Sequence, residues 1–320
     1  MKNNILAVKA FFLICALWFC AGGAAGAPPS PPKEFRSGVY VNRIDNFDVK
    51  TGTAEVDFWY WMISDGDTAT LQNLELNNGR IEPIEDAITQ KRDGKCYISR
   101  RYLAKVQCRL DLSKFPFDKQ RVCLSFEDDE LTSDKMVFVP DVANSGIDPN
   151  FQMNEWDIER IDYQIGVHKY PSSFGYLDIP SGQGSDYSQF DVIVTLSRRG
   201  SFAQKMFKYF WTFIVSVIVG LSALLIRVCD LSARFSMTVG ALFANVGCLS
   251  LLAEKIPKSP DVSLAESVSY ISLGLIMIFL VESIISLNIY NRGRQKLSRI
   301  MDCTTFALSL VCYGGMWLFI

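Results

Sequence analysis

The chain contains 320 residues, of which 49% are hydrophobic, and it carries a formal net charge of -2. This length and apolar content leave room for one soluble domain and one membrane domain. The near-neutral charge gives no electrostatic reason to expect nucleic acid as a partner.

Residues 1–27 have the features of a secretory signal peptide. Lys2 provides the positive start, the run ILAVKAFFLICALWF provides the apolar segment, and Ala25-Gly26-Ala27 has the small-x-small form of a cleavage site. An uncleaved membrane anchor is the alternative. After cleavage, the domain that follows would lie in an extracellular or periplasmic compartment, where disulfides can form.

Nine cysteines are present, but only Cys96, Cys108 and Cys123 fall in the predicted soluble part. These three allow at most one intrachain disulfide. The sequence has no pair of CxxC motifs, so we expect no structural zinc and no other metal site.

Residues 28–200 are predicted to form the soluble domain, because short runs rich in β-branched and aromatic residues alternate with turns. The runs include SGVYVNRID, TAEVDFWYWMI, QRVCLSFE and FDVIVTLSRR, and glycines such as Gly52, Gly79 and Gly146 separate them. Regular strands without amphipathic helices between them predict an antiparallel β-sandwich. The sequence shows no nucleophile elbow, phosphate-binding loop or metal cluster, so we expect neither an enzyme nor a cofactor.

Residues 201–320 are predicted to form a transmembrane domain. Four apolar runs, at about residues 207–226, 235–253, 268–289 and 300–320, have the length that a bilayer requires. The ends that would face the cytoplasm carry basic residues, namely Arg227, Arg234, Arg292, Arg294, Lys296 and Arg299. The predicted fold is therefore an α+β, multi-pass protein of the inner or plasma membrane, in which an extracellular β-sandwich precedes a four-helix transmembrane bundle.

The second apolar run has an unusual stripe of small and polar residues. Spacings of three and four place on one helix face Ser236, Gly240, Phe243, Gly247, Ser250 and Glu254. Such a face fits either a helix that lines a water-filled pore or one that packs tightly against a neighbour. We expect Arg234 and Glu254 to bracket the stripe on the same face, which favours the pore. Phe243 is the widest side chain of the stripe and would form the constriction, unless it packs between helices.

Several motifs occur in a characteristic order. They are Phe115-Pro116-Phe117-Asp118, Asn154-Glu155-Trp156, Leu196-Ser197-Arg198 and Ile256-Pro257-Lys258-Ser259-Pro260. In this order and at these spacings, the chain resembles a pentameric ligand-gated ion channel of the Cys-loop receptor superfamily. The short link before the fourth run resembles the prokaryotic members.

The signature disulfide of that superfamily would join Cys108 to a cysteine at the position of Val122, whereas this chain has Cys123, one residue later. A shift of one residue in a strand turns the side chain to the opposite face. A Cys108–Cys123 bridge and a reduced or differently paired thiol therefore both remain open.

The resemblance implies a homopentamer in a lipid bilayer that conducts an inorganic ion when a small-molecule agonist or protons act on it. The alternative is a non-conducting, membrane-anchored sensor or binding protein. The polar stripe distinguishes the two, because an anchor needs no such face.

The resemblance also implies a coupling region between the two domains. Its predicted members are Asp48, Asp118, Arg198, Pro257 and Lys258. A charge-assisted pair of Asp118 with Arg198, joined by Asp48, would transmit motion from the β domain to the linker at Pro257. The alternative is that the pair only holds the two domains in register.

Selectivity would depend on the ends of the pore helix, at Ser232, Ala233, Arg234 and Glu254. The first three resemble the sequence of anion channels in the superfamily, whereas Glu254 would place an acidic ring at the outer mouth. The balance slightly favours anions.

The ligand site of the superfamily lies between subunits, and the resemblance places candidates for it on several segments of this chain. They are Trp59, Trp61, Glu127, Asp128, Asp129, Tyr170, Phe174, Tyr176 and Tyr187. The two tryptophans would face the others from the neighbouring subunit. Aromatic faces suit an amine, and adjacent carboxylates suit an amine, calcium or a proton-sensing role. The alternative is a solvated acidic turn, with His168, the single histidine, incidental.

Overall fold

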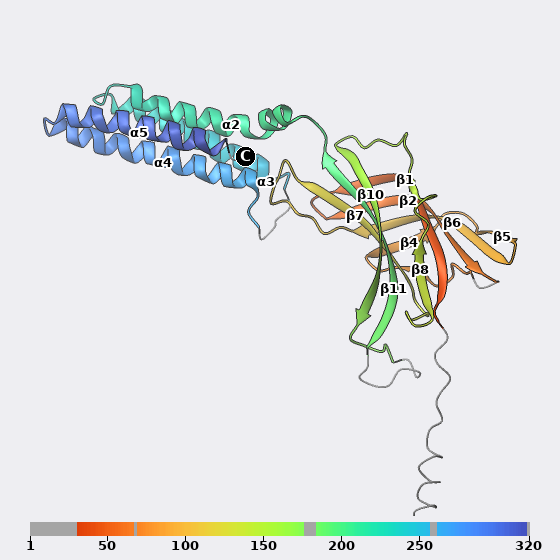
Figure 1. Ribbon diagram of the computed structural model, residues 1–320. Coiled ribbons are helices and arrows are strands. Elements are labelled where there is room, and N and C mark those ends of the chain that lie inside the picture. The colour runs from red at the N-terminus through yellow and green to blue at the C-terminus, as the bar shows by residue number, and fades with distance from the viewer. Residues whose placement is uncertain (1–30, 67–68, 176–183, 257–260, 319–320) are drawn as a thin grey trace, which may run out of the picture.

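The computed structural model describes residues 31–66, 69–175, 184–256 and 261–318. The predicted signal peptide at residues 1–27 and three predicted site residues, Tyr176, Pro257 and Lys258, lie outside the described residues. The described chain forms a β-sheet part followed by a helical bundle, and it passes once from one to the other (Figure 1). This arrangement confirms the predicted fold class.

Two sheets make up the β part. The first has the order β4-β6-β2-β1-β8, with β5 paired to β6 and β9 paired to β1, and the second has the order β10-β11-β7-β3. Pairing is antiparallel except that β8 and β9 run parallel to β1. The strands of the first sheet are β1 (Lys33–Asp48), β2 (Thr53–Asp65), β4 (Gly79–Pro83), β5 (Ile88–Arg92), β6 (Lys95–Gln107), β8 (Met136–Pro140) and β9 (Gly146–Ile147). Those of the second are β3 (Leu74–Leu76), β7 (Lys119–Asp128), β10 (Trp156–Tyr170) and β11 (Ser185–Arg198).

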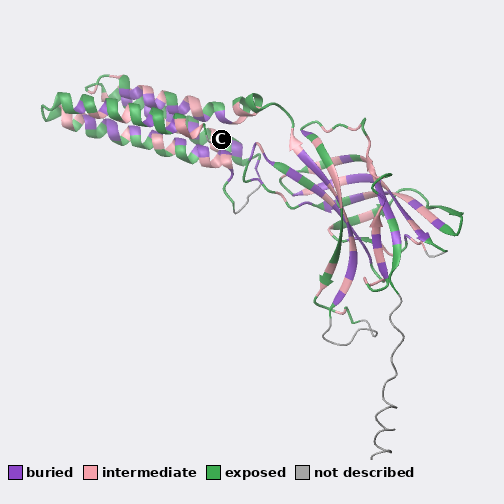
Figure 2. Ribbon diagram, viewed as in Figure 1, coloured by how far each residue is buried: buried purple, intermediate pink, exposed green. Residues whose placement is uncertain are grey.

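The core of the β part lies between the two sheets. Phe58 and Tyr60 of β2 are fully buried and contact Phe126 of β7 at ring-centroid distances of 5.6 and 4.9 Å. Phe126 in turn lies 6.1 Å from Phe190 of β11. Buried residues alternate with less buried ones in the first part of β2 and β7, and both strands then become mostly buried (Figure 2), as expected of strands with one face in a core and the other partly covered.

The bundle contains α2 (Phe202–Ser222), the short helix η1 (Ala223–Leu225), α3 (Leu231–Ala253), α4 (Leu264–Asn291) and α5 (Gln295–Met316). Capping boxes at Ser201 and Ser263 satisfy backbone N–H groups at the starts of α2 and α4. Three segments are long and apolar enough to cross a membrane: Phe202–Leu225, Leu231–Ala253 and Leu264–Asn291. The predicted fourth span is not among them, because α5 is more polar and contains Arg299 and Asp302 in its first half. Its crossing of the membrane stays a prediction.

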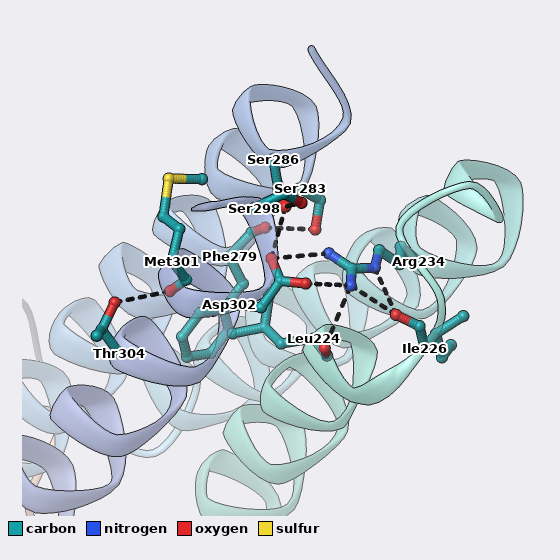
Figure 3. Close-up of polar contacts among 10 residues, drawn as sticks. All are labelled: Leu224, Ile226, Arg234, Phe279, Ser283, Ser286, Ser298, Met301, Asp302 and Thr304. Atoms are coloured by element: carbon teal, nitrogen blue, oxygen red, sulfur yellow. Dashed lines mark hydrogen bonds and ion pairs between the residues drawn. The ribbon is translucent and has the colours of Figure 1, made fainter. Parts of the chain in front are cut away.

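A buried ion pair joins α3 to α5. Arg234, which is only 1% exposed, donates to both carboxylate oxygens of Asp302, the shorter contact being 2.6 Å from Nη2 (Figure 3). It also donates to the backbone oxygens of Leu224 and Ile226, which end the preceding helical segment. Ser286 of α4 donates to the same carboxylate at 2.7 Å.

The prediction that Arg234 shares a face with Glu254 is therefore wrong. Arg234 precedes Ser236 by two residues, and at about 100° per residue it lies on the opposite side of the helix from the stripe. The buried face of α3 holds Arg234, Thr238, Ala241, Asn245 and Leu252.

We expect Arg234→Met to destabilise the chain by roughly 3–5 kcal/mol, because it leaves the Asp302 carboxylate buried without its counter-charge. The melting temperature of the purified chain in detergent measures this loss. The double variant Arg234→Met/Asp302→Leu should recover most of it, since a buried pair is often replaceable by apolar side chains. Arg292→Met, at an exposed position in the link before α5, is the control. A double variant no more stable than Arg234→Met would contradict the prediction.

Candidate functional site

An acidic and aromatic pocket forms where the end of β7 meets the β10 and β11 strands. Its volume is about 250 Å³, and its lining residues are Glu75, Glu127, Asp128, Asp129, Tyr170, Phe174 and Tyr187. All but Glu75 were predicted. The aromatic side chains contact one another, with Tyr170 lying 5.0 Å from Phe174 and 5.7 Å from Tyr187 between ring centroids.

Glu127 contacts three other side chains at this pocket through its carboxylate. Its side chain is 5% exposed and accepts hydrogen bonds from Asn77 Nδ2 at 2.8 Å and from the Tyr170 hydroxyl at 3.0 Å. His168 Nδ1 lies 2.6 Å from the same carboxylate. The Glu127 carboxylate therefore connects three parts of the chain: the turn that follows β3, strand β7 and strand β10.

Burial shifts the ionisation of the pocket. It raises the pKa of Asp128, although the backbone N–H groups of Leu131 and Glu130 donate to the Asp128 carboxylate and partly offset the effect. Burial and the neighbouring charge of Glu130 raise the pKa of Asp129. The pKa of Tyr170 also rises, first through burial and then because its hydroxyl donates to Glu127.

The acidic run is thus divided between a buried and an exposed part. Glu127 and Asp128 are 4% and 6% exposed, whereas Asp129 and Glu130 are exposed, so the alternative of a fully solvated turn is wrong for the first two. His168 contacts the Glu127 carboxylate, and whether it has more than a structural role stays a prediction. Among the residues that the structure describes, no three acidic, histidine or cysteine side chains are placed to hold a metal ion.

Sequence reasoning missed Glu75 and Asn77. Glu75 pairs directly with Glu127 across β3 and β7, and Asn77 follows β3. Strand β3 has three residues, too few to show a period, and about fifty positions separate it from Glu127 along the chain. No local signal connects these residues.

The two predicted tryptophans lie on the other sheet. Both point away from the core of β2, whose inward residues are Phe58, Tyr60 and Met62. Trp61 is 8% exposed and its indole Nε1 donates to Asp141 Oδ2 at 3.0 Å, so its ring is already covered within the subunit. Trp59 is half-buried and remains the better candidate for a contact with a neighbouring subunit.

A second site lies where the β part meets the bundle. Arg198, the last residue of β11, donates to Asp118 through Nε at 2.7 Å and through Nη2 at 3.3 Å. Asp118 is 3% exposed, and Gln120 Nε2 donates to its Oδ2 at 2.6 Å. The guanidinium also lies over the rings of Phe115 and Trp156, at 4.6 and 4.5 Å from their centroids. The predicted pairing of Asp118 with Arg198 is observed.

The Phe115–Phe117 turn then contacts the bundle directly. Phe115 meets Tyr209 of α2 at 5.0 Å between ring centroids, and Phe117 stacks on Phe202 at 5.0 Å. Leu112 and Phe115 share one buried apolar cluster with residues of α2, α3 and α4. The backbone N–H of Leu264, at the start of α4, donates to the Ser113 oxygen at 2.9 Å. The turn therefore contacts the ends of three helices.

The prediction that Asp48 joins this pair is wrong. Its carboxylate accepts from the Lys50 N–H at 2.8 Å and from the Thr51 hydroxyl at 2.9 Å, which closes the turn between β1 and β2. These hydrogen bonds, first that of the Lys50 backbone, lower the pKa of Asp48. A short acidic side chain after a strand often serves its own turn in this way.

A third site is the exposed face of α3. All six residues of the predicted stripe, Ser236, Gly240, Phe243, Gly247, Ser250 and Glu254, are exposed in the single chain, Phe243 to 71%. Ser232 is exposed and Ala233 half-buried at the start of the same helix. This face is free to meet water, lipid or other subunits.

The thiols of Cys108 and Cys123 are both free. Cys108 belongs to the core cluster together with Val122, whereas the Cys123 Sγ lies 3.3 Å from the Ser125 hydroxyl on the other face of β7. The strand register thus separates the two side chains, as the one-residue shift predicts. Burial raises the pKa of Cys108 to about 11.

No family model matches the chain. It is similar to the glycine receptor subunit beta of Rattus norvegicus, Mus musculus and Homo sapiens, with 27% identity over 168 residues in each case. The match covers 52% of this chain, and the chain spans about a third of the length of these relatives, 31–32%. These relatives are receptor subunits and not enzymes, and the similarity supports the resemblance to the Cys-loop receptor superfamily.

Proposed function

We propose that the chain is a subunit of a pentameric ligand-gated ion channel, assembled as a homopentamer in a membrane with the β part outside. The exposed face of α3 carries this proposal. The exposed sides of α2 and α4 hold large apolar residues suited to lipid, including Phe207, Trp211, Ile278, Val281 and Ile284. The predicted stripe on α3 instead holds two glycines, two serines and Glu254 around the single large apolar residue Phe243, and these small and polar residues suit a water-filled pore shared by several copies.

The link between α4 and α5 supports the prokaryotic form of such a channel. Helix α4 ends at Asn291 and α5 begins at Gln295, so only three residues join them. A link of this length has no room for a folded cytoplasmic domain between the two helices.

The acidic pocket supports a cationic agonist. Four carboxylates and three aromatic rings line it, and the described lining contains no lysine or arginine. An ammonium group gains both charge pairing and contact with aromatic faces there. A carboxylate on the same ligand would meet repulsion, so we propose a simple amine rather than an amino acid such as glycine. Protons are the second candidate, because burial raises the pKa of Asp128.

The burial of Arg234 changes the proposed ion selectivity. Its charge is compensated by Asp302 inside the bundle and does not face the stripe. Glu254, exposed at the far end of α3, is then the charged member of the stripe. An acidic ring at the mouth attracts cations, so we propose cation conduction in place of the slight preference for anions.

We expect Phe243→Ala to open the channel without agonist, because a ring of phenyl groups closes a narrow pore by excluding water. Current across a bilayer that contains the purified protein, recorded under a salt gradient, measures the opening and gives the sign of the permeant ion. Phe235→Ala is the control, since Phe235 is 46% exposed on a different side of α3. If assembled pentamers of Phe243→Ala carry no current, the non-conducting sensor becomes the better interpretation.

We expect Asp118→Asn to raise the agonist concentration for half-maximal current by about tenfold, because the neutral side chain loses one charge-assisted pair with Arg198, a change of about 1.4 kcal/mol. Agonist binding, measured by calorimetry on the full chain, should be nearly unchanged. Arg199→Gln is the control, as it removes the neighbouring exposed pair with Asp157. A variant that lowers the melting temperature but leaves current activation unaltered would assign the pair a purely structural role.

We expect binding of propylamine to weaken as the pH falls. Because the pKa values of Asp128 and Asp129 are raised above 3.8, these carboxyls take up protons at a higher pH than usual and lose the charge that holds the ammonium. Calorimetric titration between pH 7.5 and about pH 4 measures the trend. Asp128→Asn should bind about tenfold more weakly at neutral pH and show a shallower pH dependence, whereas Glu82→Gln, at an exposed position of β4 in the other sheet and outside the pocket lining, should behave as the unmodified chain. Stronger binding of glycine than of propylamine would contradict the proposed ligand class.

A further inference from the structure

A basic cavity lies at the end of the bundle away from the β part. It has a volume of about 630 Å³ and lies between the end of α2, the start of α3, the end of α4 and the start of α5. Four cationic side chains line it, namely those of Arg227, Arg234, Lys296 and Arg299. The acidic side chain in the lining is Asp302, and Figure 3 shows it held by Arg234.

The other three cations are uncompensated. Arg227, Lys296 and Arg299 are exposed, and within the described part of the chain their side chains make no hydrogen bond or ion pair. The Asp302 carboxylate does not neutralise these three cations, because it is already paired with Arg234. Three positive charges around one cavity call for an anionic ligand with several acceptor oxygens, such as a phosphate ester.

An apolar groove continues from this cavity along α5. It has a volume of about 520 Å³ and is lined by Lys296, Arg299, Ile300, Cys303, Thr304 and Ala307. Lys296, Arg299 and Cys303 line both the cavity and the groove, so the two are contiguous. A ligand that fills both has a negatively charged head and an apolar tail directed along the helix.

The surroundings of the groove are those of a surface that meets hydrocarbon. Ile300 is 58% exposed, and Leu308 and Val311, further along α5, are 67% and 70% exposed. The cavity lies where the apolar segments of α2 and α4 end, which is the level of lipid headgroups when those helices cross a membrane.

We propose that this cavity and groove form a binding site for an anionic phospholipid, with its phosphate among Arg227, Lys296 and Arg299 and one acyl chain along Ile300, Thr304 and Ala307. The proposal requires that the bundle lies in a membrane, but it does not depend on the chain being a channel. A soluble phosphate ester shares the head chemistry but has no tail for the groove.

Mass spectrometry of the intact, detergent-purified protein, titrated with phosphatidylglycerol or with phosphatidylcholine of the same acyl chains, tests the proposal. We expect phosphatidylglycerol to bind at least about tenfold more tightly, since each basic residue near a headgroup contributes about a fivefold preference for anionic lipid. Equal binding of the two lipids by the unmodified chain would overturn the proposal, and this comparison requires no variant to fold.

Variants assign the preference to the cavity. The triple variant Arg227→Gln/Lys296→Gln/Arg299→Gln should lose the preference for phosphatidylglycerol. Arg292→Gln/Arg294→Gln is the control for the double variant Lys296→Gln/Arg299→Gln, because it removes two exposed cations from the adjacent link between α4 and α5 that do not line the cavity. If the control loses as much of the preference for phosphatidylglycerol as this double variant does, non-specific surface charge explains the preference. That result would overturn the proposed site.

The groove has a separate test. Ala307→Trp should fill the groove and weaken phosphatidylglycerol binding severalfold while it leaves the weak binding of glycerol 3-phosphate unchanged. If glycerol 3-phosphate binds the unmodified chain as tightly as the lipid does, the groove contributes nothing, and a soluble phosphate ester replaces the phospholipid as the ligand.

Discussion

The ion pair of Asp118 with Arg198 is the interaction on which the joint between the β part and the bundle depends. Two charges removed from water are costly unless hydrogen bonds and nearby groups replace the lost hydration. Here Gln120 donates to the carboxylate, and the rings of Phe115 and Trp156 cover the guanidinium. The same Phe115 packs on α2, so the pair fixes the position of the turn that touches the helices.

A second buried pair organises the opposite end of the bundle in the same way. Arg234 donates to Asp302 and to the carbonyl groups that end the segment before α3, and it therefore holds the start of α3 between α2 and α5. With the buried polar side chains on one face satisfied inside the subunit, the other face of α3 is free to carry small and hydroxyl-bearing residues. Both faces of this otherwise apolar helix therefore carry some polar side chains, for different physical reasons.

The sequence predicts well whatever depends on local period. The strands, the helices and the stripe of α3 repeat every two or every three to four residues, and the structure contains them, although α5 is not apolar enough to count among the candidate membrane spans. It predicts poorly what depends on a distant partner. Asp48 was assigned to the joint although its own turn supplies its hydrogen-bond donors, and Arg234 was assigned to the stripe although Asp302 lies across the bundle. Glu75 and Asn77 come close to Glu127 only because β3 pairs with β7, and the sequence around each residue does not reveal this long-range pairing.

The two ends of α3 are held by different parts of the molecule. At its end near the β part, Leu252 packs in the cluster that contains Leu112 and Phe115, so a displacement of the turn reaches this end first. At its other end, Arg234 lines the basic cavity beside the three uncompensated cations. On our proposals, an agonist acts on one end of the pore helix through the Asp118–Arg198 pair, whereas a bound lipid acts on the other through the surroundings of Arg234. Because a rigid helix transmits a tilt along its length, the two ligands would bias the same pore from opposite sides of the membrane.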